Sequence, residues 1–192
     1  MKLLRLFGVL WVAASIPALA AEVAGVKFDD RVRIAPDTPE LVLNGAGVRT
    51  RVIVKVYVAA LYLPEKKTTA ADVLALAGPK RMWLSMLREV TGAQMTEALA
   101  DGFKANNPPA DQERYKAQLA ELAEALGTLA STKTGDTLAF DFVTGQGMVV
   151  RANGKPLGKP IGDEGFYRGL LRAWLGDRPV DADLKRGLLG QG

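Results

Sequence analysis

The chemistry open to this chain is limited by the residue types that it lacks. Its 192 residues include no Cys and no His. Cys–His and Ser–His–Asp catalysis are therefore excluded, because each needs an imidazole as the base. Zinc sites rely on the same two residue types, and the D-x-D-x-D-G pattern of a calcium loop is absent, so we expect no metal and no cofactor. Disulfides are impossible, and the hydrophobic core has to supply the stability.

Charged residues give no indication of a polyanionic partner. The chain has 25 Lys and Arg residues and 21 Asp and Glu residues, with both signs interspersed. A surface that binds nucleic acid needs clustered cations, so nucleic acid is not an expected partner.

Residues 1–20 contain the three parts of a secretory signal peptide. Lys2 and Arg5 precede an uncharged apolar run over 6–17, and a small-x-small cleavage site follows at 18–20. The alternative is a membrane anchor, but a spanning helix needs roughly 20 apolar residues. We predict cleavage, a single mature domain over 21–192 without a membrane span, and a periplasmic or secreted location. The mature chain keeps 23 basic and 21 acidic residues, a net charge of +2.

The strongest strand pattern follows the segment Asn44–Gly47. Residues 51–61 alternate with a period of two and are rich in β-branched types, which predicts one long strand that bends and ends at Pro64. Gly45 and Gly47, just before it, allow backbone geometry that other residues resist. Both faces of this strand carry apolar residues, so we expect both to be partly covered.

The remaining elements predict an α+β domain. Strands are expected at 81–90 and 136–144, and Asn153-Gly154 marks a hairpin turn. Helices are expected at 69–77, 93–106, 110–126 and 164–175, with a short one from Asp181. Asp163 is expected to cap the helix over 164–175. Because strands and helices do not alternate regularly, an antiparallel sheet backed by helices is favoured over a doubly wound parallel sheet.

Three segments resemble the chalcone-isomerase-like superfamily, which includes plant chalcone isomerases, plastid fatty-acid-binding proteins and exported bacterial homologues. They are Gly45–Arg49 with Lys55–Tyr57, then Thr91–Gln94, and a C-terminal hairpin and helix over 153–176. The resemblance implies an open-faced β-sandwich, with a large antiparallel sheet, helices packed on one face, and a ligand in a cleft between sheet and helices.

The resemblance also implies three ligand-binding residues. In that family an Arg in the glycine turn holds an anionic or carbonyl oxygen, and here it is Arg49. Tyr57 stands where true isomerases have an active-site Thr, as in the fatty-acid-binding members. Met95 replaces the catalytic Tyr that follows the Thr-Gly-x-Gln segment, and Gly102 replaces an Asn. Since these polar groups are missing, no catalytic residue is assigned.

These positions favour a non-catalytic protein that binds a small amphipathic carboxylate, such as a fatty acid. Arg49 would pair with the carboxylate through two parallel hydrogen bonds, Tyr57 would add a hydroxyl donor, and Met95 would line an apolar pocket. The alternatives are an intramolecular lyase of the chalcone isomerase type and a cell-envelope interaction protein whose cleft is closed by side chains. A structural role for Arg49 and core packing for Tyr57 also remain open.

Overall fold

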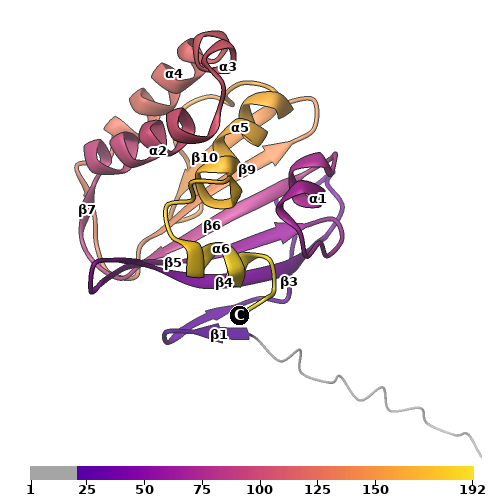
Figure 1. Cartoon of the computed structure of the whole chain (residues 1–192), viewed down its shortest axis with the longest axis vertical. Helices are drawn as coiled ribbons and strands as arrows, with labels where there is room; N and C mark the ends of the chain where they lie inside the picture. The colour runs from indigo at the N-terminus through magenta and orange to yellow at the C-terminus, as the bar shows by residue number, and fades with distance from the viewer. Residues whose placement is uncertain (1–20) are drawn as a thin grey trace, which may run out of the picture.

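The computed structural model describes residues 21–192, and the predicted signal peptide lies outside the described residues. Seven strands form one antiparallel sheet in the order β11-β10-β9-β6-β5-β4-β3 (Figure 1). Their bounds are β3 (Arg31–Val32), β4 (Leu41–Arg51), β5 (Val54–Leu63), β6 (Lys80–Met86), β9 (Thr137–Val143), β10 (Gly147–Ala152) and β11 (Lys155–Pro156). Two small pairs flank this sheet, β1 (Ala21–Val23) with β2 (Val26–Phe28) and β7 (Val90–Thr91) with β8 (Ser131–Thr132).

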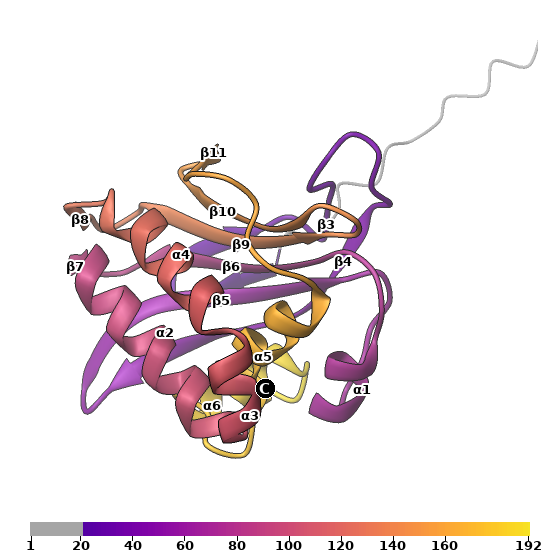
Figure 2. The same ribbon diagram turned by 90° about the horizontal axis from the view of Figure 1, so that it is seen from above.

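The helices cover one face of the sheet, as Figure 2 shows. They are α1 (Ala70–Ala75), α2 (Gly92–Asn106), α3 (Pro109–Arg114), α4 (Lys116–Gly127), α5 (Glu164–Leu175) and α6 (Ala182–Leu188). Helix α5 begins as the sequence predicts, because the Asp163 carboxylate accepts a hydrogen bond from the Phe166 amide at 2.8 Å. In the part of the chain that the structure describes, no helix has the length and apolarity to cross a bilayer.

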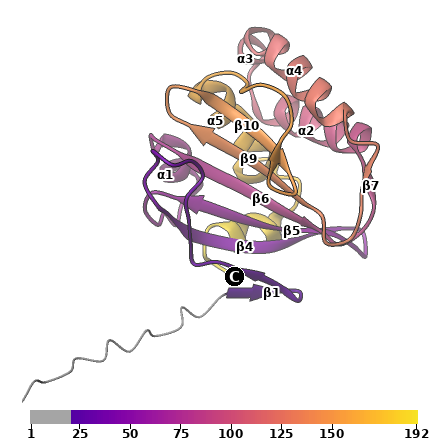
Figure 3. The ribbon, with the colours of Figure 1, turned by 180° about the vertical axis from the view of Figure 1, so that it is seen from behind.

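Each face of the sheet packs against its own hydrophobic cluster. The larger one, the helix-side cluster, forms where inward residues of β5, β6 and β9 meet α2, α4 and α5. On the other side, alternate residues such as Val58, Ala60 and Tyr62 of β5 pack under the N-terminal segment around Phe28 and Ile34. Figure 3 shows that segment from behind, beside β4. The predicted α+β fold, with helices on one face and both faces covered, is confirmed.

The predicted strand over residues 51–61 is wrong at its start. Val52 and Ile53 form a two-residue hairpin turn between Arg51 of β4 and Val54 of β5. Val52 has a φ of 61°, a conformation that such turns usually give to Gly, Asn or Asp. The apolar alternation continues through the turn without any of these residues, so the sequence contains no turn signal there.

The glycine turn that the resemblance implies is also wrong, because Gly45 and Gly47 lie inside β4. Both residues allow helix α6 to approach the strand closely. A Cβ on Gly45 would overlap the carbonyl oxygen of Gly187, and one on Gly47 would lie 3.2 Å from Cδ1 of Leu184. A glycine inside a strand often marks such an approach of another backbone.

Two other predicted elements are shorter than expected. The helix over 110–126 is divided at Tyr115 into α3 and α4, and the strand over 81–90 ends at Met86. The Asn153-Gly154 hairpin turn is confirmed, with φ values of 49° and 77° at these two residues.

Candidate functional site

Arg49 and Tyr57 are direct cross-strand partners on β4 and β5. The Cζ atom of Arg49 lies 5.5 Å from the centroid of the Tyr57 ring, which is within the range of a cation–π contact. Tyr57 is 2% exposed, and its hydroxyl accepts a hydrogen bond from Nε1 of Trp174 at 2.9 Å. The phenol therefore gives the guanidinium a fixed apolar support.

Burial raises the pKa of Tyr57 above its usual value, although the charge of Arg49 acts in the opposite direction. A buried phenolate would be poorly solvated, so the ring stays neutral at physiological pH. Tyr57 consequently adds no negative charge that could neutralise Arg49.

A β-bulge shapes the strand beside this pair. The register shifts between Arg49 and Thr50, whose partners on β5 are Tyr57 and Lys55, and Val56 is left without a partner on β4. As a result, the successive residues Val56 and Tyr57 both belong to the helix-side cluster. Bulges commonly re-aim side chains in this way beside functional sites.

Arg49 borders a cleft of about 520 Å³ between the β4–β5 hairpin, the β6–β7 loop, helix α2 and the segment before α6. Its lining combines four arginines, three carboxylates and a set of small apolar residues. The charged residues are Arg49, Arg51, Arg88, Arg178, Glu89, Glu97 and Asp101. The apolar residues are Val56, Val90, Ala98, Gly102, Ala105 and Val180. This combination suits a ligand with an anionic head and an apolar body.

The guanidinium of Arg49 has no carboxylate partner among residues 21–192. None of the ion pairs in this range involves Arg49. Its Nε atom is buried and has no hydrogen-bond acceptor within the same residues. Most buried polar groups in proteins are paired, so Arg49 is a candidate for contact with a ligand.

Arg88 and Arg178 were not among the predicted site residues, although both line the cleft. Arg88 follows β6 and Arg178 follows α5, so they are distant from Arg49 in the sequence. No local motif marks either residue, and only the fold brings them to this cleft. Arg51 also lines the cleft, whereas Lys55 is exposed and does not line it.

A family model described as chalcone isomerase-like matches residues 20–190. The chain belongs to the chalcone isomerase-like family. This chalcone isomerase-like protein is similar in structure to a fatty-acid binding protein of Arabidopsis thaliana, with a TM-score of 0.63 and 14% identity over 86% of this chain and 92% of that chain. At that identity, the similarity shows the fold. No curated protein matches this chain in sequence.

Met95, the third predicted ligand residue, lies in the core of this chalcone isomerase-like protein. It is 5% exposed and belongs to the helix-side cluster together with Tyr57 and Trp174. The structure brings Arg49 and Tyr57 into contact. Of the three predicted ligand residues, Arg49 lines the cleft, whereas Tyr57 and Met95 do not.

The motif that precedes Met95 has a structural explanation. The Thr91 hydroxyl accepts a hydrogen bond from the Gln94 amide at 3.1 Å, and the Gln94 side chain accepts one from the Thr91 amide at 3.0 Å. This reciprocal capping box starts α2. Gly102, at the position of the isomerase Asn, packs α2 closely against α5, where an added Cβ would lie 2.6 Å from Cβ of Ala173.

Proposed function

We propose that this chalcone isomerase-like protein binds a small amphipathic carboxylate, such as a fatty acid, in the cleft that Arg49 borders, without catalysing isomerisation. The observation that carries the proposal is the state of Arg49. Its guanidinium stacks over Tyr57 without a carboxylate partner among residues 21–192. The Arabidopsis protein of similar fold, which is described as fatty-acid binding, supports the same ligand class.

A carboxylate is the ligand group that suits the guanidinium of Arg49. Two parallel N–H···O bonds give an Arg–carboxylate pair both strength and orientation. Arg81 makes such a pair within this protein, donating from Nε and Nη2 to Asp141. A ligand carboxylate that engages Arg49 in the same way would satisfy its buried Nε after a rotation of the side chain.

The apolar part of the cleft would hold the ligand's hydrocarbon body. Val56, Val90 and Val180 lie among its lining residues. Each buried methylene contributes about 0.8 kcal/mol. Four covered methylenes would thus add about 3 kcal/mol to the pairing at Arg49.

The roles of Tyr57 and Met95 in ligand binding stay predictions. The Tyr57 hydroxyl is already bonded to Trp174, so its support for the Arg49 guanidinium is the contribution that the geometry favours. Met95 lies on the face of α2 that is buried against the sheet. Contact between Met95 and a ligand would require α2 to move away from the sheet.

A cell-envelope interaction protein is the second candidate, and the filled interior between sheet and helices favours it. Tyr57, Met95 and Trp174 are each at most 5% exposed. Under this alternative the cleft would bind no lipid, and the Arg49 substitution below would change no lipid affinity.

The test is a displacement titration with a fluorescent long-chain fatty acid. Arg49→Ala should weaken binding at least tenfold, since it removes the group that pairs with the carboxylate. Arg31→Ala is the matched control, because that exposed guanidinium pairs with Glu40 at 3.2 Å outside the cleft. Equal affinities of the wild type and Arg49→Ala would reject the proposal.

We also propose that the protein is periplasmic or secreted, on the basis of the sequence of residues 1–20. Fractionation of the source cells, followed by N-terminal sequencing, tests this. The mature chain should begin near Ala21 in the exported fraction, and an intact chain from Met1 in the cytosol would contradict it.

A further inference from the structure

The tip of the β4–β5 hairpin is apolar and exposed. Val52 is 93% exposed, Ile53 88% and Val54 43%. Figure 1 shows this tip at the end of the sheet near β7. Single exposed apolar side chains are common on protein surfaces, but three consecutive β-branched residues at a turn are not explained by packing.

The backbone at the tip makes this choice of residues costly. Val52 has a φ of 61°, which is a genuine outlier for a β-branched residue. A two-residue hairpin turn with a positive φ at its first position is best served by Gly. Because neither the turn geometry nor solvent exposure favours Val52 and Ile53, we infer that these side chains are retained for an interaction.

The charges beside the tip indicate the partner. The sequence from Leu41 to Leu63 contains Arg49, Arg51 and Lys55 but no acidic residue. One carboxylate from elsewhere in the chain reaches this hairpin, where Asp181 accepts a hydrogen bond from the Thr50 amide at 2.9 Å. Arg51 and Lys55 are exposed and stand at the ends of β4 and β5 next to the turn. Apolar side chains flanked by cations match a membrane interface, where the cations lie near lipid phosphates.

We propose that the β4–β5 tip docks on the surface of an anionic lipid bilayer. Val52 and Ile53 would enter the boundary between headgroups and acyl chains, with Arg51 and Lys55 at the phosphates. A protein partner is less well matched, since a stable interface covers about 800 Å² on each side and this tip offers only a few side chains. Arg51 also lines the cleft, so the docked protein would bring the cleft next to the lipid surface.

The first test uses the absence of cysteine from the sequence. Ile53→Cys carries an environment-sensitive dye at the tip, and Lys66→Cys carries it at an exposed position beyond the opposite end of β5. With vesicles of phosphatidylglycerol and phosphatidylcholine, the dye at 53 should brighten about threefold, while the dye at 66 should not respond. Equal responses at the two positions would overturn the proposal.

The second test separates docking from folding of the turn. The double substitution Val52→Gly and Ile53→Asn gives the turn residues that suit its backbone. It should keep or raise the thermal midpoint, yet lower vesicle affinity about tenfold. A variant that binds vesicles as well as the wild type would show that the tip is not the docking element.

The third test addresses the cations beside the tip. The double substitution Arg51→Gln and Lys55→Gln should lower affinity for anionic vesicles about tenfold, whereas Arg31→Ala, at the opposite end of the sheet from the tip, should leave it within about twofold. The variants are compared in the full chain and in residues 21–192, so that the apolar run over 6–17 cannot explain a difference between them. A dye response at 53 that needs no vesicles and rises with protein concentration would instead indicate self-association.

Discussion

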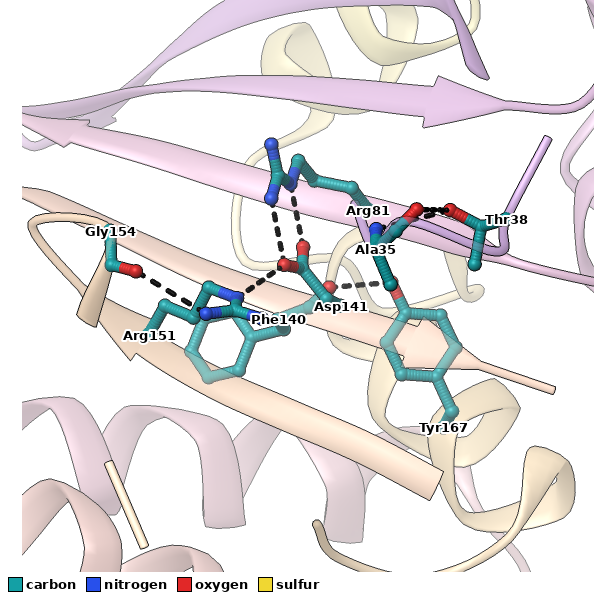
Figure 4. A network of polar contacts seen from close by, with 8 residues as sticks. All are labelled: Ala35, Thr38, Arg81, Phe140, Asp141, Arg151, Gly154 and Tyr167. Carbon is teal, nitrogen blue, oxygen red and sulfur yellow. Dashed lines mark hydrogen bonds and ion pairs between the residues drawn. The ribbon is translucent and has the colours of Figure 1, made fainter. Parts of the chain in front are cut away.

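Two arginine sites lie on opposite faces of the same sheet, and they differ in their partners. On the face away from the helices, Arg81 donates to Asp141 at 2.6 and 2.7 Å, and Nε of Arg151 donates to the same carboxylate at 3.1 Å (Figure 4). Asp141 is completely buried. On the helix face, the guanidinium of Arg49 lies over the ring of Tyr57.

The difference shows how a structural arginine can be told from a candidate binding arginine. The carboxylate that holds Arg81 and Arg151 comes from β9, an interior strand of the sheet, so that site is complete within the fold. Arg49 would be expected to have a comparable partner if its role were structural. Among residues 21–192 it has no ion pair, and it borders a cleft instead.

Removing the charge of Asp141, which holds Arg81 and Arg151, should have the largest effect on stability. Asp141→Asn leaves Arg81 partly buried without its counter-charge, which should cost about 3 kcal/mol of unfolding free energy. Urea denaturation measures this cost, and fatty-acid affinity should not change. A cost below about 1 kcal/mol would mean that the network contributes little, as exposed ion pairs do.

Ligand addition should stabilise the protein through Arg49. A fatty acid at about 100 times its Kd should raise the unfolding free energy of the wild type by about 2.7 kcal/mol. Arg49→Ala, with affinity weakened about tenfold, should keep only about half of that gain. Asp141→Asn should keep all of it, as calorimetry or denaturation with and without ligand would show. If the ligand stabilised Arg49→Ala as much as the wild type, Arg49 would be no more a binding residue than Arg81.

Alkaline pH should destabilise the protein by ionising Tyr62, which lies on the same face of the sheet as Arg81. Burial raises the pKa of Tyr62 to about 12, and Asp29 adds to the effect. Because the folded pKa exceeds the unfolded value of about 10, stability is retained below pH 10 and lost as the pH rises through about 12. Tyr62→Phe should reduce this loss by about 2 kcal/mol, measured by denaturation at pH 9 and about pH 12. Identical pH profiles of stability for the wild type and Tyr62→Phe would show that Tyr62 does not cause the loss.

Removing the hydroxyl of Tyr57, the residue beneath Arg49, should have the smallest effect on stability and ligand affinity. Tyr57→Phe removes the acceptor for Nε1 of Trp174, and an unsatisfied buried donor costs about 1 kcal/mol. The ring remains under the guanidinium, so ligand affinity should fall less than about threefold. A tenfold loss of affinity would instead show that the Tyr57 hydroxyl contacts the ligand.

The sequence predicted the elements with clear local signals and misread those decided by tertiary contacts. Asp163 and the apolar spacing after it predict α5, and Asn153-Gly154 predicts its hairpin, because caps and turn residues act over a few positions. Gly45 and Gly47 look like a turn, although their role depends on α6, which follows far along the chain.

The same limit applies to the candidate site. A motif identifies Arg49 and Tyr57, but the two residues meet because the chain turns at Val52 and Ile53, a turn that the predicted strand over 51–61 does not contain. Arg88 and Arg178 reach the cleft only through the packing of β6, α2 and α5. The burial of Met95 likewise depends on how α2 rests on the sheet, which its position after the capping box does not reveal.

The central claim is that Arg49 holds the carboxylate of an amphipathic ligand. It is tested most directly by carbon-13 NMR of a fatty acid labelled at its carboxyl carbon, titrated with pH while bound to the wild type and to Arg49→Gln. An adjacent guanidinium favours the ionised form, so the pKa of the bound carboxyl should be lower in the wild type by about one unit. The same pKa in both proteins, or no bound signal in either, would contradict the account.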